Sequence, residues 1–248
     1  MAVKNNTVSF SGGVEVSDYC DIIGPTENKM TAWQEILDYL KSKGFTRLEL
    51  DNIPETSASL NYFRTRYAAL ISKEDTTPLV SLPASNEEFI TQLPRKSRHE
   101  LRRKIRKFER DHPEIIISEK NPDQSINDLL QLMRLDPGKN EFLTPDMEAF
   151  FRLLFKNLSD RTIFLTLSVK SEVTAVTVGF NNNDSFYLYN SGFNETDFSG
   201  SGYYLKAKSI ETAISKGLKT FNFLQGNERY KYELGGKDFY VYNVKLTL

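Results

Sequence analysis

Residues 185–226 read SFYLYNSGFNETDFSGSGYYLKAKSIETAISKGLKTFNFLQG, and this stretch decides the fold. Its first nine residues have the aromatic and apolar composition of a strand. The glycine-rich FSGSG loop then opens a helix that is expected from about Tyr203 to Lys216, with Gly217 as its stop. LKTFNFLQ, residues 218–225, follows as a second strand. A strand, a glycine loop, a helix and a strand therefore succeed one another without a break.

The neighbouring segments extend this pattern in both directions. RTIFLTLSVK and VTAVTVGF, separated by short polar turns, predict an antiparallel meander with residues 185–193. A last strand is expected at residues 239–248. Upstream, the apolar spacing predicts helices at 26–44, 86–92, 95–112, 125–135 and 144–158 and strands at 47–53 and 114–119, with 136–142 as a loop. Between residues 54 and 84, SLNYFRTRY suits a helix and PLVSLPA suits an edge strand.

Composition excludes several classes of protein. The 248 residues carry a formal net charge of -1, so the whole chain has no electrostatic bias toward nucleic acid or an anionic membrane. The single cysteine, Cys20, excludes an internal disulfide framework, and no metal site is indicated by the spacing of His99 and His112.

No apolar run is long enough to span a bilayer, and the first residues lack the apolar segment of a signal peptide. We therefore expect a cytoplasmic protein; the sequence does not indicate its oligomeric state.

The segment Arg95 to Arg110 is the most polarised part of the chain. It holds nine Lys or Arg side chains against two Glu, a local charge of about +7. A helix over this segment places Leu101, Ile105 and Phe108 on one apolar stripe. Its charges are either a solvated outer face or a contact for an anion such as tRNA.

The segment FNFLQGNERYKYELGG, residues 221–236, runs from an apolar strand pattern into a glycine and a charged cluster. Glu228 and Lys231 are three residues apart, a spacing that permits a local ion pair. The same two groups suit acid–base chemistry and the stabilisation of an oxyanion. From the residues alone, both interpretations stay open.

Three segments resemble one family: LPRKSRHELRRKIRKFE at 93–109, SGSGYYLKAKSIETAISKG at 199–217 and FNFLQGNERYKYELG at 221–235. They look like the CelD-like acetyltransferases with two GNAT halves, which are related to the Fem-type aminoacyl transferases. The resemblance implies an α/β (α+β) fold with a mixed, mostly antiparallel sheet and flanking helices. It also implies an incomplete N-terminal GNAT-like half at 1–92, a basic linking helix at 93–112 and a C-terminal acyltransferase half at 113–248.

The resemblance also implies where a donor and the catalytic groups lie. The arm of an acyl-coenzyme A is expected to pair with main-chain groups near Tyr189, Asn190 and Ser191, and its pyrophosphate to rest on the start of the following helix. The residues expected at that helix start are Gly200, Ser201, Gly202 and Tyr203. The expected catalytic residues are Glu228 as proton acceptor, Lys231 as the cation for an oxyanion or phosphate, and Tyr230 as an orienting group.

One residue departs from the family pattern. Asp197 stands where the coenzyme A loop usually has Gln or Arg, and an acid there would repel phosphate. The loop at 199–203 therefore has an alternative reading as an ordinary strand-to-helix turn.

The expected function is transfer of an acyl group, in the simplest case acetyl, from acyl-coenzyme A to a small-molecule or peptide amine or hydroxyl, by direct attack and without a metal. The alternatives are an aminoacyl-tRNA-dependent Fem-type transferase and a degenerate GNAT module that only binds an anionic partner. The sequence does not identify the acceptor.

Overall fold

The computed structural model describes residues 1–67 and 70–248, which fold into two compact units. The first unit comprises residues 1–78, 225–227 and 238–248, and the second comprises residues 79–224 and 228–237. This division differs from the boundaries expected at 92 and 112. The basic helix lies inside the second unit, and the last strand lies in the first. The unit to which a segment belongs depends on pairing between strands that are far apart in the sequence, and such pairing has no local sequence signal.

The first unit is a five-stranded sheet in the order β1-β2-β3-β11-β4. Its strands are β1 (Ala2–Lys4), β2 (Thr7–Ser9), β3 (Arg47–Pro54), β4 (Ile71–Thr76) and β11 (Tyr240–Thr247), and its helices are η1 (Thr26–Asn28), α1 (Lys29–Ser42) and α2 (Ala58–Tyr67). The pairs are antiparallel except β2 with β3. Trp33 on α1 and Phe63 on α2 are fully buried, with ring centroids 4.9 Å apart. The predicted α1, α2 and β3 are confirmed, whereas β1, β2 and β4 were not predicted.

The second unit is a six-stranded sheet in the order β5-β10-β9-β8-β7-β6. Its strands are β5 (Leu79–Ser81), β6 (Ile115–Lys120), β7 (Thr162–Val169), β8 (Glu172–Asn182), β9 (Ser185–Phe193) and β10 (Thr220–Asn222). Its helices are α3 (Asn86–Gln92), α4 (Arg95–Asp111), α5 (Pro122–Met133), α6 (Pro137–Phe142), α7 (Pro145–Asn157), α8 (Ser201–Ser215) and α9 (Arg229–Glu233). Every pair is antiparallel except β9 with β10, so the predicted meander of β7, β8 and β9 is confirmed.

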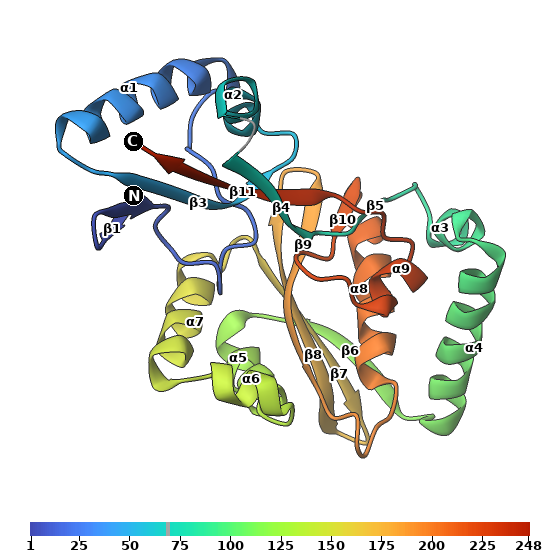
Figure 1. The fold of residues 1–248 in the computed structure, drawn as a ribbon. Helices are drawn as coiled ribbons and strands as arrows, with labels where there is room; N and C mark the ends of the chain where they lie inside the picture. Colours follow the sequence, from blue (N-terminus) through green and yellow to red (C-terminus); the bar gives the residue numbers. More distant parts are fainter. Residues whose placement is uncertain (68–69) are drawn as a thin grey trace. The chain divides into compact units, whose positions relative to one another are not determined.

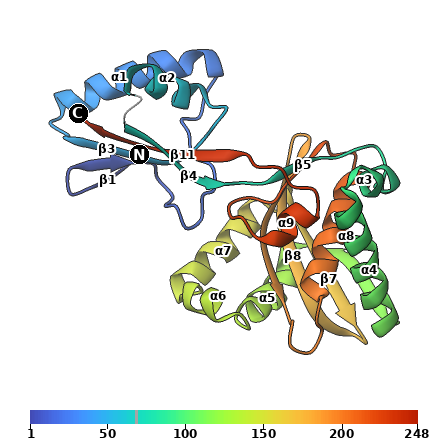
Figure 2. The ribbon, with the colours of Figure 1, turned by 45° about the vertical axis from the view of Figure 1, so that its right-hand side comes forward.

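Helices cover both faces of the second sheet (Figure 1). Helices α5 and α7 lie on one face and α8 on the other, and the turned view shows the same arrangement (Figure 2). Successive strand residues point to opposite faces. Phe164 on β7 accordingly packs in the α5 and α7 core, whereas its neighbour Leu165 packs in the α8 core. Burial on both sides explains why β7 and β8 read as continuous apolar runs.

The basic helix α4 has the predicted apolar stripe. Leu101 and Phe108 are each 4% exposed and belong to the α8 core, and Ile105 packs against it. The Phe108 ring stacks on Tyr204 of α8 at 4.8 Å. Polar contacts add to this packing: the Tyr204 hydroxyl of α8 donates to Glu109 at 3.1 Å, and Lys104 pairs with Glu233 of α9 at 2.6 Å.

The segment at 136–142, predicted as a loop, is the helix α6. Asp136 caps it by accepting a hydrogen bond from the amide of Lys139, and Pro137 stands in its first turn. An acidic cap followed by proline is a helix-start signal, but six residues give too little apolar periodicity to reveal the helix.

The strand predicted over LKTFNFLQ is shorter than expected. β10 covers only Thr220–Asn222. The Asn222 side chain accepts the amide hydrogen of Leu224 at 2.8 Å, and Leu224 has φ of +58°. A turn therefore ends the strand immediately after Asn222, because a residue in the left-handed region cannot continue an extended chain.

Candidate active site

Strands β9 and β10 run together only briefly. Their parallel ladder joins residues 220–222 to residues 185–187, and β9 continues for a further six residues to Phe193. Along these six residues, one edge of β9 pairs with β8. In the described part of the chain, no strand forms a ladder with the other edge of β9. Because β10 ends at Asn222 while β9 continues, an edge of β9 is left to which an extended ligand can add as a strand.

A β-bulge marks the point where β9 leaves β10. The register with β8 pairs Gly179 with Leu188 and Val178 with Asn190, which leaves Tyr189 as the extra residue. The Tyr189 ring packs in the core beside Phe180, at 5.1 Å between centroids. Of the three β9 residues predicted to meet a donor, Tyr189 therefore offers its main chain and not its side chain.

The main-chain groups of Ser191 are engaged by two side chains. Its amide donates to Asn190 Oδ1 at 2.8 Å, and its carbonyl accepts from Lys139 Nζ of α6. Lys139 also donates to Asn190 Oδ1 at 3.2 Å. The two groups project to one side of the strand. Asn190 and Lys139 thus hold the hydrogen-bonding positions that a donor's amide would take at this edge.

The start of α8 has the glycine-containing turn that the sequence predicts. Its two glycines are needed for different reasons. Gly200 has φ of +92°, which glycine adopts without strain. A Cβ on Gly202 would lie 2.7 Å from the Phe193 ring, so packing against β9 requires this glycine. Ser201 is fully buried and its amide donates to Phe198 O. The amides of Gly202 and Tyr203 lie in the first turn, where N–H groups have no acceptor within the helix.

An acidic residue that the sequence did not single out lies on this loop. Glu195 Oε1 accepts hydrogen bonds from the amide of Gly200 at 2.9 Å and from Ser199 Oγ at 3.2 Å. The suspected Asp197 instead accepts from Asn194 Nδ2 at 2.9 Å. The carboxylate of Glu195 therefore already occupies one of the positions on this loop that could bind an anion.

A cavity of about 330 Å³ lies beside the same loop, between α4 and α8. Arg103, Lys104 and Lys107 line it from α4, and Gly200 and Tyr203 line it from the start of α8. Lys104 Nζ lies 4.0 Å from the centre of the Tyr203 ring. Burial raises the pKa of the Tyr203 hydroxyl, and that hydroxyl has no hydrogen-bond partner among the described residues. Each of these three cations pairs with a carboxylate: Arg103 with Glu100, Lys104 with Glu233 and Lys107 with Asp111. An anion in the cavity would share them with these carboxylates.

The charged elbow after β10 folds into the short helix α9, with Glu228 just before it. Lys231 is 1% exposed, and its Nζ lies 3.0 Å from Leu224 O and 2.9 Å from Glu228 Oε2. The predicted local ion pair is therefore present. Glu228 is more than half exposed, so the pair extends from the core to the surface. Lys231 also holds the carbonyl of the turn at Leu224.

Tyr230 lies beside a further lysine that the sequence analysis missed. Lys206 of α8 is 7% exposed, and its Nζ lies 4.2 Å from the ring centre of Tyr230 and 4.7 Å from that of Phe193. Burial, together with the charges of Lys139 and Lys231, lowers the pKa of Lys206 to about 8. Burial also lowers the pKa of Lys139 and raises that of the Tyr230 hydroxyl. No motif places Lys139 and Lys206 near the elbow.

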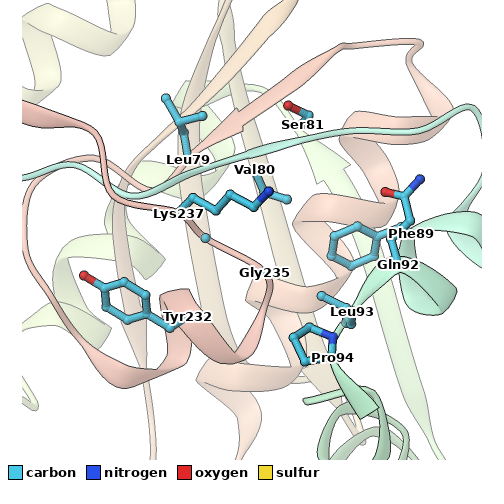
Figure 3. A pocket seen from close by; sticks show the side chains of 11 residues that line it. Leu79, Val80, Ser81, Phe89, Gln92, Leu93, Pro94, Tyr232, Gly235 and Lys237 are labelled. Atoms are coloured by element: carbon cyan, nitrogen blue, oxygen red, sulfur yellow. The ribbon is translucent and has the colours of Figure 1, made fainter. Parts of the chain in front are cut away.

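A second cavity, of about 340 Å³, lies on the far side of β10 (Figure 3). Its lining comes from β5, α3 and the chain after α9, and Phe89 and Leu93 face the chain at Gly235. A Cβ at Gly235 would lie 2.8 Å from Leu93. This cavity contains none of the predicted site residues.

The described residues offer neither a metal-binding cluster nor a helix suited to a membrane. They contain no group of three or more His, Cys, Asp or Glu side chains placed to hold a metal ion. None of their helices combines the length and apolar character that crossing a membrane requires.

The chain belongs to the acetyltransferase (GNAT) domain family, whose model matches residues 95–232, more than half of its length. The family and the mixed α/β fold predicted from the sequence are thereby confirmed, and acyl transfer is the general activity of this class. No curated protein matches the chain.

Solved structures share the fold at low sequence identity. A conserved protein of unknown function from Bacteroides thetaiotaomicron is 12% identical with a TM-score of 0.68, and the match covers 88% of this chain and 75% of that one. The C-terminal domain of a putative lysylphosphatidylglycerol synthetase from Agrobacterium fabrum is 13% identical with a TM-score of 0.67, covering 98% and 79%. FemX is 10% identical with a TM-score of 0.64, covering 93% and 80%.

Proposed function

We propose that this protein transfers an acyl group, in the simplest case acetyl, from acyl-coenzyme A to an amine or hydroxyl acceptor. The observation that carries the proposal is that β10 ends at Asn222, opposite Tyr187, whereas β9 continues to Phe193. An extended arm can pair with the edge of β9, while phosphates are attracted to the first turn of α8 and to the cations of α4. For the arm to pair at Ser191, Lys139 and Asn190 must release its main-chain groups.

The chemistry needs a proton acceptor and a positive charge near the reacting carbonyl. We assign Glu228 as the base, because its carboxylate is partly exposed at the elbow. Lys231 places a fixed ammonium at the end of β10 and favours the negative charge that develops in the transition state. Tyr230, buried between Phe223 and Lys206, orients the groups around it. Attack is direct, so the protein contributes by positioning and electrostatics.

Acetyl-coenzyme A binding tests this proposal by calorimetry. We expect saturable binding, and we expect Glu195→Gln to bind the donor about tenfold more tightly, because the substitution removes a carboxylate that competes with phosphate for the Gly200 amide. Glu172→Gln, at an exposed strand end, serves as the matched control and should leave the affinity unchanged. Absence of binding to both the unchanged protein and Glu195→Gln at millimolar donor would contradict the coenzyme A assignment.

A second candidate function is aminoacyl-tRNA-dependent transfer. Two observations favour it: Glu195 fills the amide position of the phosphate loop, and the charged side of α4 extends well beyond the cavity beside Gly200. The test compares turnover with charged tRNA and with acyl-coenzyme A. A protein that binds anions through residues 95–110 and turns over neither donor would be the degenerate binding module.

Salt dependence distinguishes a tRNA contact from a solvated helix face. If α4 contacts tRNA, the logarithm of the binding constant falls linearly with that of salt concentration, by roughly 0.7–0.9 units for each phosphate neutralised. Replacing Arg106 and Arg110 by glutamine is expected to reduce the slope by about two units. Filter binding at four salt concentrations measures it. A slope that is the same in both proteins argues against contact through these two side chains.

A further inference from the structure

The edge of β9 beyond its ladder with β10 is approached by three lysines from three elements. Lys139 arrives from α6 and binds the carbonyl of Ser191, and Lys206 arrives from α8 and lies over the ring of Phe193, two residues further along. Lys231 follows the end of β10. Helices α5 and α8 cover opposite faces of this sheet, and α6 directly follows α5, so Lys139 and Lys206 come from opposite faces, whereas Lys231 comes from the short helix α9.

The carboxylates near this cluster act on Lys139 and Lys206 without a hydrogen bond to either in the described chain: Glu228 and Glu195 raise the pKa of Lys206, and Asp136 and Glu228 raise that of Lys139, in both cases against the larger effect of burial. Glu228 pairs with Lys231. Lys139 donates to neutral oxygens of Asn190 and Ser191. Lys206 is more than nine-tenths buried, lies against two aromatic rings, and donates no hydrogen bond to the residues that the structure describes. A buried ammonium without an acceptor is costly, and such groups are concentrated at functional sites.

We infer that Lys206 and Lys139 form a subsite for a carboxylate carried by the acceptor, beside the edge of β9 where transfer is proposed to occur. The inference deepens the proposed function by naming the acceptor class: an amine or hydroxyl that bears a carboxylate, as an amino acid does. A carboxylate offers two oxygens to the two ammonium groups that lack an acidic hydrogen-bond partner. It would supply the acceptor that Lys206 lacks.

The subsite is distinct from the position proposed for donor phosphates. Lys206 lies six residues after Gly200 on α8, which is about 9 Å along the helix axis. The cavity beside Gly200 is lined by cations of α4 and contains neither Lys139 nor Lys206. A donor occupying that cavity and β9 therefore leaves the two lysines to contact the acceptor.

The test follows the side-chain resonance of Lys206 by NMR in the protein labelled with ¹³C-lysine, and identifies it by its absence from Lys206→Met. Acetate is the probe, with chloride at equal ionic strength as reference and inorganic phosphate as a second anion. We expect saturable acetate binding that raises the pKa of Lys206 above its value of about 8 in the free protein. Affinity should fall as the pH rises through that value, because the ammonium loses its proton.

Variants separate the subsite from the fold and from donor binding. Lys206→Met should bind acetate at least tenfold more weakly, yet melt at or above the temperature of the unchanged protein at pH 7, because it removes an unpaired buried charge. Lys216→Met, on the surface at the end of α8 and paired with Glu119, should bind acetate normally. The unchanged protein, Lys206→Met and Lys216→Met should bind acetyl-coenzyme A equally. Loss of that binding in all three would count against the donor assignment and not against the subsite.

Three results would overturn the inference. One is a Lys206 resonance that responds equally to chloride and acetate. Another is tighter binding of phosphate than of acetate, which would assign the subsite to a phosphoryl group. The third is acetate affinity that is unchanged in Lys206→Met.

Discussion

Replacement of Lys231 by methionine is expected to lower kcat/KM for acyl transfer by roughly 10²–10³-fold, the usual cost of removing a fixed charge that stabilises an oxyanion. Methionine has a similar length and no charge. Transfer is measured as release of free thiol from acetyl-coenzyme A in the presence of carboxylate-bearing amines. A rate equal to that of the unchanged protein would remove Lys231 from the mechanism.

The same substitution is expected to weaken the fold, and this effect must be measured separately. Lys231 is almost fully buried and donates to Leu224 O, so methionine leaves that carbonyl without this donor. An unsatisfied buried group costs ~1–3 kcal/mol. Urea unfolding of Lys231→Met should show a loss of that size. Rates are therefore compared at temperatures where both proteins are fully folded.

Two matched variants separate catalysis from stability. Glu228→Gln retains the hydrogen bond between Lys231 and Leu224 and removes the proposed base, so transfer should fall by ~10²–10⁴-fold with little loss of stability. Lys237→Met changes an exposed lysine six residues beyond Lys231 and should alter neither quantity. Equal loss of rate in Lys237→Met would indicate a general charge effect.

Replacement of Gly192 by alanine is expected to cause a large loss of stability for a single added methyl group. A Cβ at this position would lie 2.7 Å from the backbone nitrogen of Met133 and 2.8 Å from the backbone oxygen of Leu129. Both atoms belong to α5, which cannot yield as a flexible side chain could. Overpacking typically costs ~1–3 kcal/mol, and contact with helix backbone places this site at about 3 kcal/mol.

Thermal unfolding measures this effect, as a melting temperature lowered by roughly 6–12 °C in a chain of this size. Gly24→Ala is the matched control, because a Cβ there has no neighbour within 4 Å and should change the melting temperature little. A Gly192→Ala protein as stable as Gly24→Ala would show that α5 is not packed this closely on β9.

Much of the fold could be predicted from the sequence because its signals are local. Thr144 caps α7 by accepting the amide hydrogen of Met147, and Leu101 and Phe108 form the buried side of α4. The helix cap and the apolar stripe each depend on residues a few positions apart. The strands β7, β8 and β9 were evident from composition, since burial on both faces leaves them few polar residues.

The candidate site was predictable only in part. Glu228, Lys231 and Gly200 could be proposed from the sequence because each belongs to a contiguous family-like segment. Glu195 was missed because the approach of its carboxylate to the Gly200 amide depends on the path of the loop. Lys206 was missed because a lysine in the middle of a helix is usually at the surface.

The sequence by itself determined most of the longer helices and strands and the family that the chain resembles, because periodicity, caps and motifs act over a few residues. The tertiary structure alone decided that β10 ends at Asn222, that β9 continues without it, and that β11 joins the first unit. It also decided that Lys139 and Lys206 approach one strand edge from opposite faces. These features depend on pairing and packing between distant residues, whose free energies have no local signature in the chain.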